Sequence, residues 1–141
     1  KRMEVIEKVL EAARAAGVPD SKVYVDPLAM TIATMNQSAV IACDTIRAVH
    51  AKYPDVHFTM GLSNISFGLP ARKQVNRGLL ILAMQAGLDS AILDPLDKEL
   101  QAAIVTTELL LGKDRHCLNY LKASRKGLFD GEESKGGKTA Q

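Results

Sequence analysis

Three polar segments follow directly after short hydrophobic runs of the chain, where their side chains can serve a ligand. They are Asp26, the pair Ser63-Asn64 and Asp94, which follow the runs 21–25, 56–62 and 90–93. A carboxylate in such a position can accept two parallel N–H bonds from an amidine-like edge of a heterocycle. An asparagine amide both donates and accepts, so it can follow a ligand atom through a change in protonation. These residue types indicate a polar site for a small ligand.

Each of these side chains also has a purely local interpretation. Asp26 can cap the turn before the next helix, Asn64 can form an Asx turn, and Asp94 can bond within a turn that also contains Asp97. Arg72, which stands at the start of a predicted helix downstream of Asn64, can meet an anionic group or lie in solvent. Residue type and spacing alone leave both interpretations open.

Other kinds of site find little support in the sequence. The three histidines, His50, His57 and His116, are scattered and have no Glu or Cys at ligand spacing, so no metal site is predicted. The dinucleotide, P-loop and nucleophile-elbow glycine motifs are missing from the sequence. A net charge of +2 and an aromatic content of 4% argue against nucleic acid as a partner.

The pattern of hydrophobic residues predicts alternating helices and short strands. Helical periodicity marks residues 2–16, 37–52, 71–86, 98–111 and 116–126, and strand-like runs mark 21–25, 56–62 and 90–93. This order favours an α/β fold with parallel strands joined by right-handed crossovers. The carboxyl ends of parallel strands meet at one edge of the sheet, so the three polar segments are expected to lie there. The tripeptide Asp-Pro-Leu occurs at 26–28 and again at 94–96, which indicates a faint internal repeat.

The chain has 141 residues, the length of one ordinary domain. Residues 1–126 are expected to form it, and residues 127–141, rich in Gly and charge, are predicted to be a disordered tail. No stretch is apolar for long enough to span a bilayer, so no membrane partner is predicted. Cys43 and Cys117 lie far apart, which indicates reduced thiols in a cytoplasmic protein.

Several motifs together resemble the pterin-binding methyltransferases, which include the methyltetrahydrofolate:corrinoid protein methyltransferases and the folate domain of cobalamin-dependent methionine synthase. The resemblance covers about residues 1–121, and its core is the Gly-Leu-Ser-Asn segment spaced after Asp-Pro-Leu. The motifs that carry it are Val23-Tyr24-Val25-Asp26-Pro27-Leu28, the run 61–70, Arg72, Asn76-Arg77, Ala83-Met84, Gly87-Leu88-Asp89 and Ile92-Leu93-Asp94-Pro95-Leu96-Asp97.

The resemblance implies a (β/α)8 TIM barrel of the dihydropteroate synthase type, of which this chain would supply the C-terminal part. A complete barrel needs about 250 residues, and the chain has a little over half of that. It further implies that Asp26 holds the pterin ring and that Asn64, the catalytic residue, lies near N5 and stabilises the charge that develops there. Ser63, Arg72 and Asp94 would line the same pocket as substrate-binding residues.

The activity implied is transfer of the methyl group of N5-methyltetrahydrofolate to the Co(I) of a corrinoid, a cobalamin-type cofactor held by a partner protein. The resemblance also implies a homodimer, and the missing strands imply the N-terminal half of the barrel, or another chain, as a partner. Two alternatives stay open at this point: a non-catalytic α/β assembly module, and another pterin enzyme such as a dihydropteroate synthase.

Overall fold

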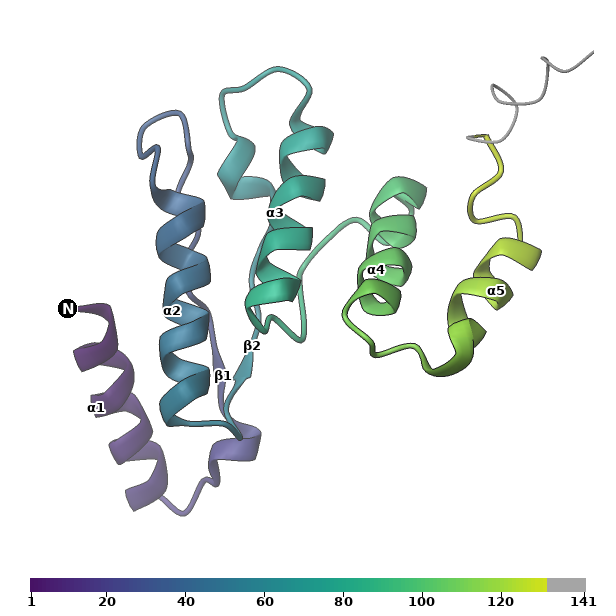
Figure 1. The fold of residues 1–141 in the computed structure, drawn as a ribbon. Helices are drawn as coiled ribbons and strands as arrows, with labels where there is room; N and C mark the ends of the chain where they lie inside the picture. Colours follow the sequence, from purple (N-terminus) through teal and green to yellow (C-terminus); the bar gives the residue numbers. More distant parts are fainter. Residues whose placement is uncertain (132–141) are drawn as a thin grey trace, which may run out of the picture. The chain divides into compact units, whose positions relative to one another are not determined.

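The computed structural model describes residues 1–131, which divide into two compact units (Figure 1). The first unit is Lys1–Leu93, and the second begins at Asp94. Among the described residues, no helix is both long and apolar enough to cross a membrane.

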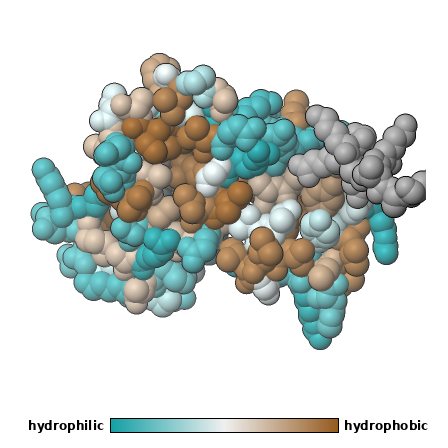
Figure 2. All heavy atoms as spheres, turned by 45° about the horizontal axis from the view of Figure 1, so that its top comes forward, coloured by the Kyte–Doolittle hydropathy of each residue, from teal (hydrophilic) through white to brown (hydrophobic). Residues whose placement is uncertain are grey.

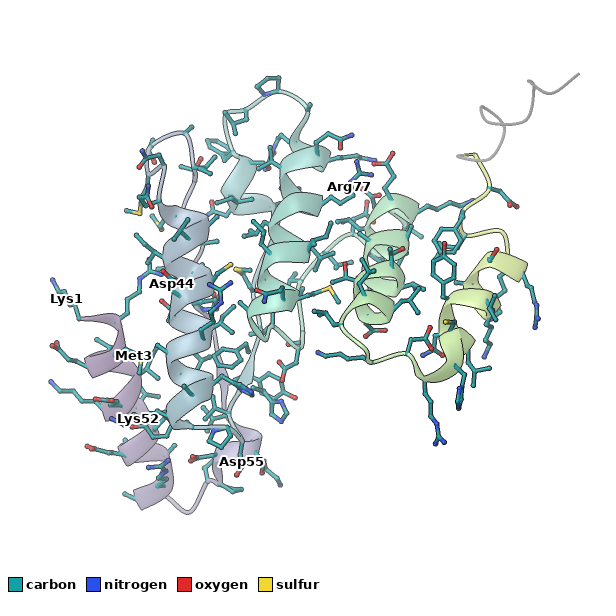
Figure 3. All side chains as sticks on the ribbon, in the orientation of Figure 1. Lys1, Met3, Asp44, Lys52, Asp55 and Arg77 are labelled. Atoms are coloured by element: carbon teal, nitrogen blue, oxygen red, sulfur yellow. The ribbon has the colours of Figure 1, made fainter. Side chains whose placement is uncertain are left out.

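The first unit consists of three helices on one side of a small parallel sheet (Figure 1). Its elements in chain order are α1 (Arg2–Ala15), η1 (Asp20–Lys22), β1 (Tyr24–Val25), α2 (Ser38–Lys52), β2 (His57–Phe58), η2 (Ser63–Ser66) and α3 (Arg72–Ala86). The predicted helices 2–16, 37–52 and 71–86 are therefore confirmed to within about one residue at each end. Polar side chains also hold the helices together: Lys52 of α2 reaches Glu7 of α1 at 2.5 Å (Figure 3).

The sheet is parallel, as predicted, but its strands are shorter than predicted. β1 pairs with β2 in parallel, with Tyr24 opposite His57. The predicted third strand appears as a single parallel bridge between Gly61 and Ile92. Backbone bonds support that pairing, because the N–H of Ile92 donates to the carbonyl of Met60 at 2.9 Å. Successive pieces of chain thus lie side by side, which places their carboxyl ends at one edge.

The prediction of a strand from residue 21 is wrong at its beginning. Asp20–Lys22 forms a 3₁₀ turn, in which the N–H of Val23 donates to the carbonyl of Asp20 at 2.9 Å. The Asp20 carboxylate also accepts two bonds from the Arg14 guanidinium, at 2.8 and 2.6 Å. This ion pair to the end of α1 fixes the turn, which pattern alone does not reveal.

The hydrophobic core lies between the sheet and the helices. Phe58, Met60 and Leu62 alternate along the chain and are 0%, 1% and 2% exposed. The helices bury Ala42, Ile46 and Val49 from α2, and Leu79, Leu80 and Ala83 from α3. On the other face of the sheet, Tyr24 and Ile92 are 58% and 73% exposed. One face of the sheet is therefore covered by helices, and side chains on the other remain open.

The second unit contains α4 (Lys98–Leu110), η3 (Arg115–Cys117) and α5 (Leu118–Arg125). The carboxylate of Asp97 caps α4, as predicted, by accepting from the N–H groups of Glu99 and Leu100 at 3.0 and 3.2 Å. The last helix begins later than the predicted residue 116, because His116 and Cys117 have left-handed φ angles of 57° and 58°.

The predicted tail begins at residue 127, and its first five residues are described. They form turns, and the ring of Phe129 packs against that of Tyr120 with centroids 4.8 Å apart. The rest of that prediction falls on residues 132–141, which lie outside the described residues.

Candidate functional site

Asp26 lies at the end of β1 and forms the local turn that its spacing allows. Its Oδ1 accepts a bond from the N–H of Leu28 at 2.8 Å, and Leu28 has a left-handed φ of 56°. The carbonyl of Pro27, in the same turn, accepts from the Arg2 guanidinium at 2.5 Å. The Asp26 side chain is nevertheless exposed. One of its oxygens thus shapes the turn, while the carboxylate remains accessible to a ligand.

Asp94 makes the same side-chain bond in the second copy of the tripeptide. Its Oδ1 accepts from the N–H of Leu96 at 2.9 Å, against 2.8 Å for the equivalent bond of Asp26. The sequence repeat therefore corresponds to a repeated hydrogen bond, although the left-handed φ of Leu28 is not repeated at Leu96. Asp94 is the first residue of the second unit.

Asn64 does not make the Asx turn that its spacing allows. It lies in η2, after β2, and its Nδ2 donates to the carbonyl of Ala29 at 2.8 Å. That carbonyl belongs to the loop after β1, so the bond joins the segments that follow two neighbouring strands. Because a carbonyl only accepts, the amide nitrogen must face Ala29, and Oδ1 faces away. No described residue donates a hydrogen bond to this Oδ1.

Two further bonds join the same two loops. The N–H of Ile32 donates to the carbonyl of Ile65 at 2.9 Å, and the hydroxyl of Thr31 donates to the carbonyl of Phe67 at 2.8 Å. The loop after β1 is itself fixed to α2, because the N–H of Met30 donates to Ser38 Oγ at 2.7 Å. The structure therefore brings the Asp26 and Asn64 loops together, as the parallel order predicted.

Arg72 neither lies free in solvent nor pairs with an acid among the described residues. Its Nε donates to Ser66 Oγ at 3.0 Å, and its Nη2 donates to the carbonyl of Ser63 at 2.7 Å. The guanidinium carbon also lies 5.9 Å from the centre of the Phe67 ring. Ser63 takes part through its backbone carbonyl, and its exposed side chain makes no bond to a described residue.

Sequence reasoning missed Ser66 and Ala29. Ser66 is 0% exposed and receives the Arg72 bond, while Ala29 is 4% exposed and offers only its carbonyl to Asn64. Ser66 differs from Ser63 in the sequence only by position within the loop. Ala29 has no polar side chain, so no residue-type signal marks it.

The loops that carry these polar groups also expose hydrophobic side chains. Figure 2 turns the top of Figure 1 forward and shows apolar atoms gathered over part of the first unit. The exposed large hydrophobic residues in the two loops are Leu28, Met30, Met35 and Phe67, of which Phe67 is 65% exposed. A groove of about 240 Å³ also runs beside Asp26, between the start of α1 and residues 26–28. Within residues 1–131, no cluster of three or more His, Cys, Asp or Glu side chains could hold a metal ion.

Comparison with known proteins identifies relatives of the chain. Residues 1–94 match the model of a family described as "Pterin binding enzyme". The chain is 41% identical over 127 residues to the methylcorrinoid:tetrahydrofolate methyltransferase of Eubacterium limosum, covering 90% of this chain and 47% of that protein. It is 40% identical over 99 residues to the methionine synthase of Mycobacterium tuberculosis, covering 65% of this chain and 8% of that protein. The chain thus spans about half the length of the first of these relatives and a small part of the second.

Proposed function

Because the chain belongs to the family of pterin binding enzymes, we propose that it carries part of the pterin site of a methyltransferase. The name of the Eubacterium limosum relative supports methyl transfer that involves tetrahydrofolate and a corrinoid. The observation that carries the proposal is the bond from Asn64 Nδ2 to the Ala29 carbonyl, at 2.8 Å. It holds the one amide of the site beside the Asp26 loop and leaves Oδ1 open.

The proposed reaction moves a methyl group between N5 of tetrahydrofolate and the cobalt of a corrinoid held by a partner protein. In the forward direction the N5–methyl bond breaks, its electron pair stays on N5, which takes up a proton, and Co(I) supplies the pair for the new carbon–cobalt bond. The name of the Eubacterium limosum relative states the opposite direction. The same groups serve both directions, so both belong in the assay.

Asp26 is proposed to bind the pterin ring. The ring has an amidine-like edge with two parallel N–H groups, which matches the two oxygens of a carboxylate. The turn bond from Leu28 occupies one lone pair of Oδ1 and orients the carboxylate. The side chain remains exposed, so a ligand can reach it.

Asn64 is proposed as the catalytic residue. Its Oδ1 can accept from N5 when N5 carries a proton, which is the form in which N5 is a good leaving group. Its Nδ2 is held by Ala29, so the amide is oriented before the reaction begins. A polar group that is fixed in advance stabilises developing charge without having to reorganise. Ser63 is proposed to line the same pocket, next to the Arg72 guanidinium that bonds to its carbonyl. Asp94, which belongs to the second unit, stays a prediction from the sequence as a substrate-binding residue.

The chain is further proposed to form the C-terminal part of a (β/α)8 barrel. The parallel strands, covered by helices on one face, are what such a part requires. On the other face Tyr24 and Ile92 are exposed, and on α1 Val5 and Val9 are 58% and 56% exposed. These apolar surfaces fit a complementary N-terminal half, in the same protein or in another chain. A corrinoid protein and a second copy of the protein are the other proposed partners.

A calorimetric titration of methyltetrahydrofolate tests the proposal. We expect tight binding when the chain is mixed with a separately made N-terminal half-barrel of a relative, and little binding to the chain alone. Asp26→Ala should abolish this binding, whereas Asp44→Ala should not, because Asp44 is a surface carboxylate paired with Arg47 on α2 (Figure 3). A folded chain that binds no methyltetrahydrofolate, either alone or in the mixture, would instead support a non-catalytic assembly module.

Methyl transfer tests the role of Asn64. In the mixture that binds pterin, Asn64→Ala should lower the transfer rate by about 10²-fold or more, the scale of a lost preorganised polar group. Wild-type rates in this variant, in both directions of transfer, would refute the assignment. Formation of dihydropteroate in place of methyl transfer would assign the chain to the other pterin activity.

A further inference from the structure

Arg72 and Ser66 together fix the segment that presents Asn64. We propose that both are positioning residues of the pterin site, and that Arg72 acts through this segment and not by binding the anionic tail of the ligand. The inference rests on the proposed function. It adds Ser66 to the site and gives Arg72 a different task from that of a substrate-binding residue.

The three groups involved form a closed set of hydrogen bonds around Asn64. Arg72 Nε donates to Ser66 Oγ at 3.0 Å, Arg72 Nη2 donates to the Ser63 carbonyl at 2.7 Å, and Ser66 Oγ donates to that same carbonyl at 3.1 Å. Ser63 directly precedes Asn64, and Ser66 follows it by two residues. The set therefore clamps η2 on both sides of the residue that it presents.

Burial makes this clamp specific. Ser66 is 0% exposed, so its hydroxyl has no access to water as an alternative partner. Through that single hydroxyl it accepts from Arg72 and donates to Ser63. Alanine at position 66 would remove both bonds at once, and would change little else because the two residues have similar volumes.

The charge of Arg72 meets only neutral partners among the described residues. Both acceptors are uncharged oxygens, and the third neighbour is the Phe67 ring, 5.9 Å from the guanidinium carbon. The planar fork of a guanidinium serves two acceptors at once, which the single ammonium of lysine cannot do in the same geometry. Ala71 has a left-handed φ of 50° directly before Arg72, a conformation that alanine adopts only at a cost. The start of α3 is thus built so that Arg72 can fold back onto the loop.

The same segment is held from its other side by the loop after β1. Ile65 and Phe67 offer their carbonyls to Ile32 and Thr31, at 2.9 and 2.8 Å, and Asn64 bonds to Ala29. Loss of the clamp would therefore leave η2 attached on one side only. Asn64 would remain present but would be less well oriented.

A comparison of two ligands separates this role from contact with the ligand tail. The mixture of the chain with the N-terminal half-barrel is titrated with tetrahydrofolate and with a tetrahydropterin that lacks the benzoylglutamate tail. Arg72→Lys and Ser66→Ala should each weaken binding of both ligands by a similar factor, about tenfold, the scale of one lost charge-assisted bond. Arg47→Lys is the matched control, because Arg47 also makes two side-chain bonds, to Asp44 and Gln85, but lies on α2.

Weaker binding of tetrahydrofolate alone, with unchanged binding of the tailless pterin, would overturn the inference and assign Arg72 to the tail. Unchanged binding of both ligands in Ser66→Ala would overturn it as well.

Hydrogen exchange tests the clamp without any ligand. Backbone amides of residues 63–67 should exchange faster in Arg72→Lys and Ser66→Ala than in wild type or Arg47→Lys, while amides in the middle of α2 should not change. Equal exchange in all four proteins would overturn the clamp. Faster exchange in the two variants, together with a wild-type protein that binds neither pterin, would support the clamp but refute the proposed function. The two failures are therefore distinguishable.

Discussion

Ser38 and Ser90 each contribute one hydroxyl to the first unit, and we expect their removal to have different costs. Ser38, in the first turn of α2, is 0% exposed, and its Oγ accepts the N–H of Met30 at 2.7 Å. Ser38→Ala leaves that N–H without its acceptor in a partly buried position. A stranded donor of this kind costs about 1–3 kcal/mol of unfolding free energy.

Ser90→Ala removes a bond of similar length without stranding its partner. The Ser90 hydroxyl donates to the carbonyl of Phe58 at 2.9 Å, but the backbone N–H of Ser90 donates to the same carbonyl at 3.0 Å. The carbonyl therefore stays satisfied after the hydroxyl is lost. The expected cost is that of one ordinary hydrogen bond at most, about 1 kcal/mol or less.

Urea unfolding of the two variants and of wild type measures this difference. The free energy of unfolding follows from the midpoint and from the slope with urea concentration. The free energy of unfolding of Ser38→Ala should lie below that of Ser90→Ala by about 1 kcal/mol or more. The slope of this free energy with urea concentration should be equal in the two variants. Equal losses, or a larger loss in Ser90→Ala, would refute the argument that the stranded donor sets the cost.

Three further outcomes follow from local features. Ala71→Gly should raise the free energy of unfolding by about 0.5–1 kcal/mol in urea, because relief of the left-handed φ of 50° exceeds the entropy cost of glycine; a loss would contradict it. The hydrogen bond from Arg14 lowers the pKa of the Asp20 carboxyl, so this pair stabilises the fold above the ordinary carboxyl pKa and ceases to do so as the pH falls through the lowered value. Asp20→Asn should therefore lower the urea midpoint at pH 7 and match wild type once the pH falls below the lowered pKa of Asp20; a constant difference across this pH range would rule this out. Burial raises the pKa of the Cys43 thiol, whereas Cys117 is exposed, so a thiol reagent should label Cys117 in the native protein and Cys43 only on unfolding; equal native rates would contradict it.

The helices could be predicted closely because their signals are local. Apolar residues recur at helical spacing, and Gly17 and Gly87, with φ angles of 79° and 121°, end α1 and α3 where the sequence indicates. The strands were predicted in the right places but with excess length. A strand ends where its pairing ends, and pairing depends on segments far away in the chain.

The site residues likewise divide into those with local partners, which could be predicted, and those with partners that the sequence does not mark. Asp26 and Asp94 form turns within two residues of themselves, so the tripeptide predicts both. Asn64 and Arg72 instead use partners that are distant or unmarked: Ala29 lies 35 residues away, and the Ser63 carbonyl is a backbone group. Such partners carry no sequence signature, so the sequence could indicate that these side chains matter but not what they contact.

The groups that the site leaves uncommitted suggest which form of the ligand it favours. Part of the donor capacity of the site is already used, because one N–H of the Asn64 amide is bound to Ala29 and two N–H groups of Arg72 are bound to the loop. The open positions at Asn64 Oδ1 and at the Asp26 carboxylate are acceptors. A site of this kind favours a ligand edge that donates. In the proposed reaction, N5 can donate when it bears a proton, as in tetrahydrofolate or in protonated methyltetrahydrofolate, but not in neutral methyltetrahydrofolate. With Asn64 at N5, as we propose, its open acceptor would match N5 in the state that releases a methyl group or has just released one, which would be differential binding of the kind that catalysis requires.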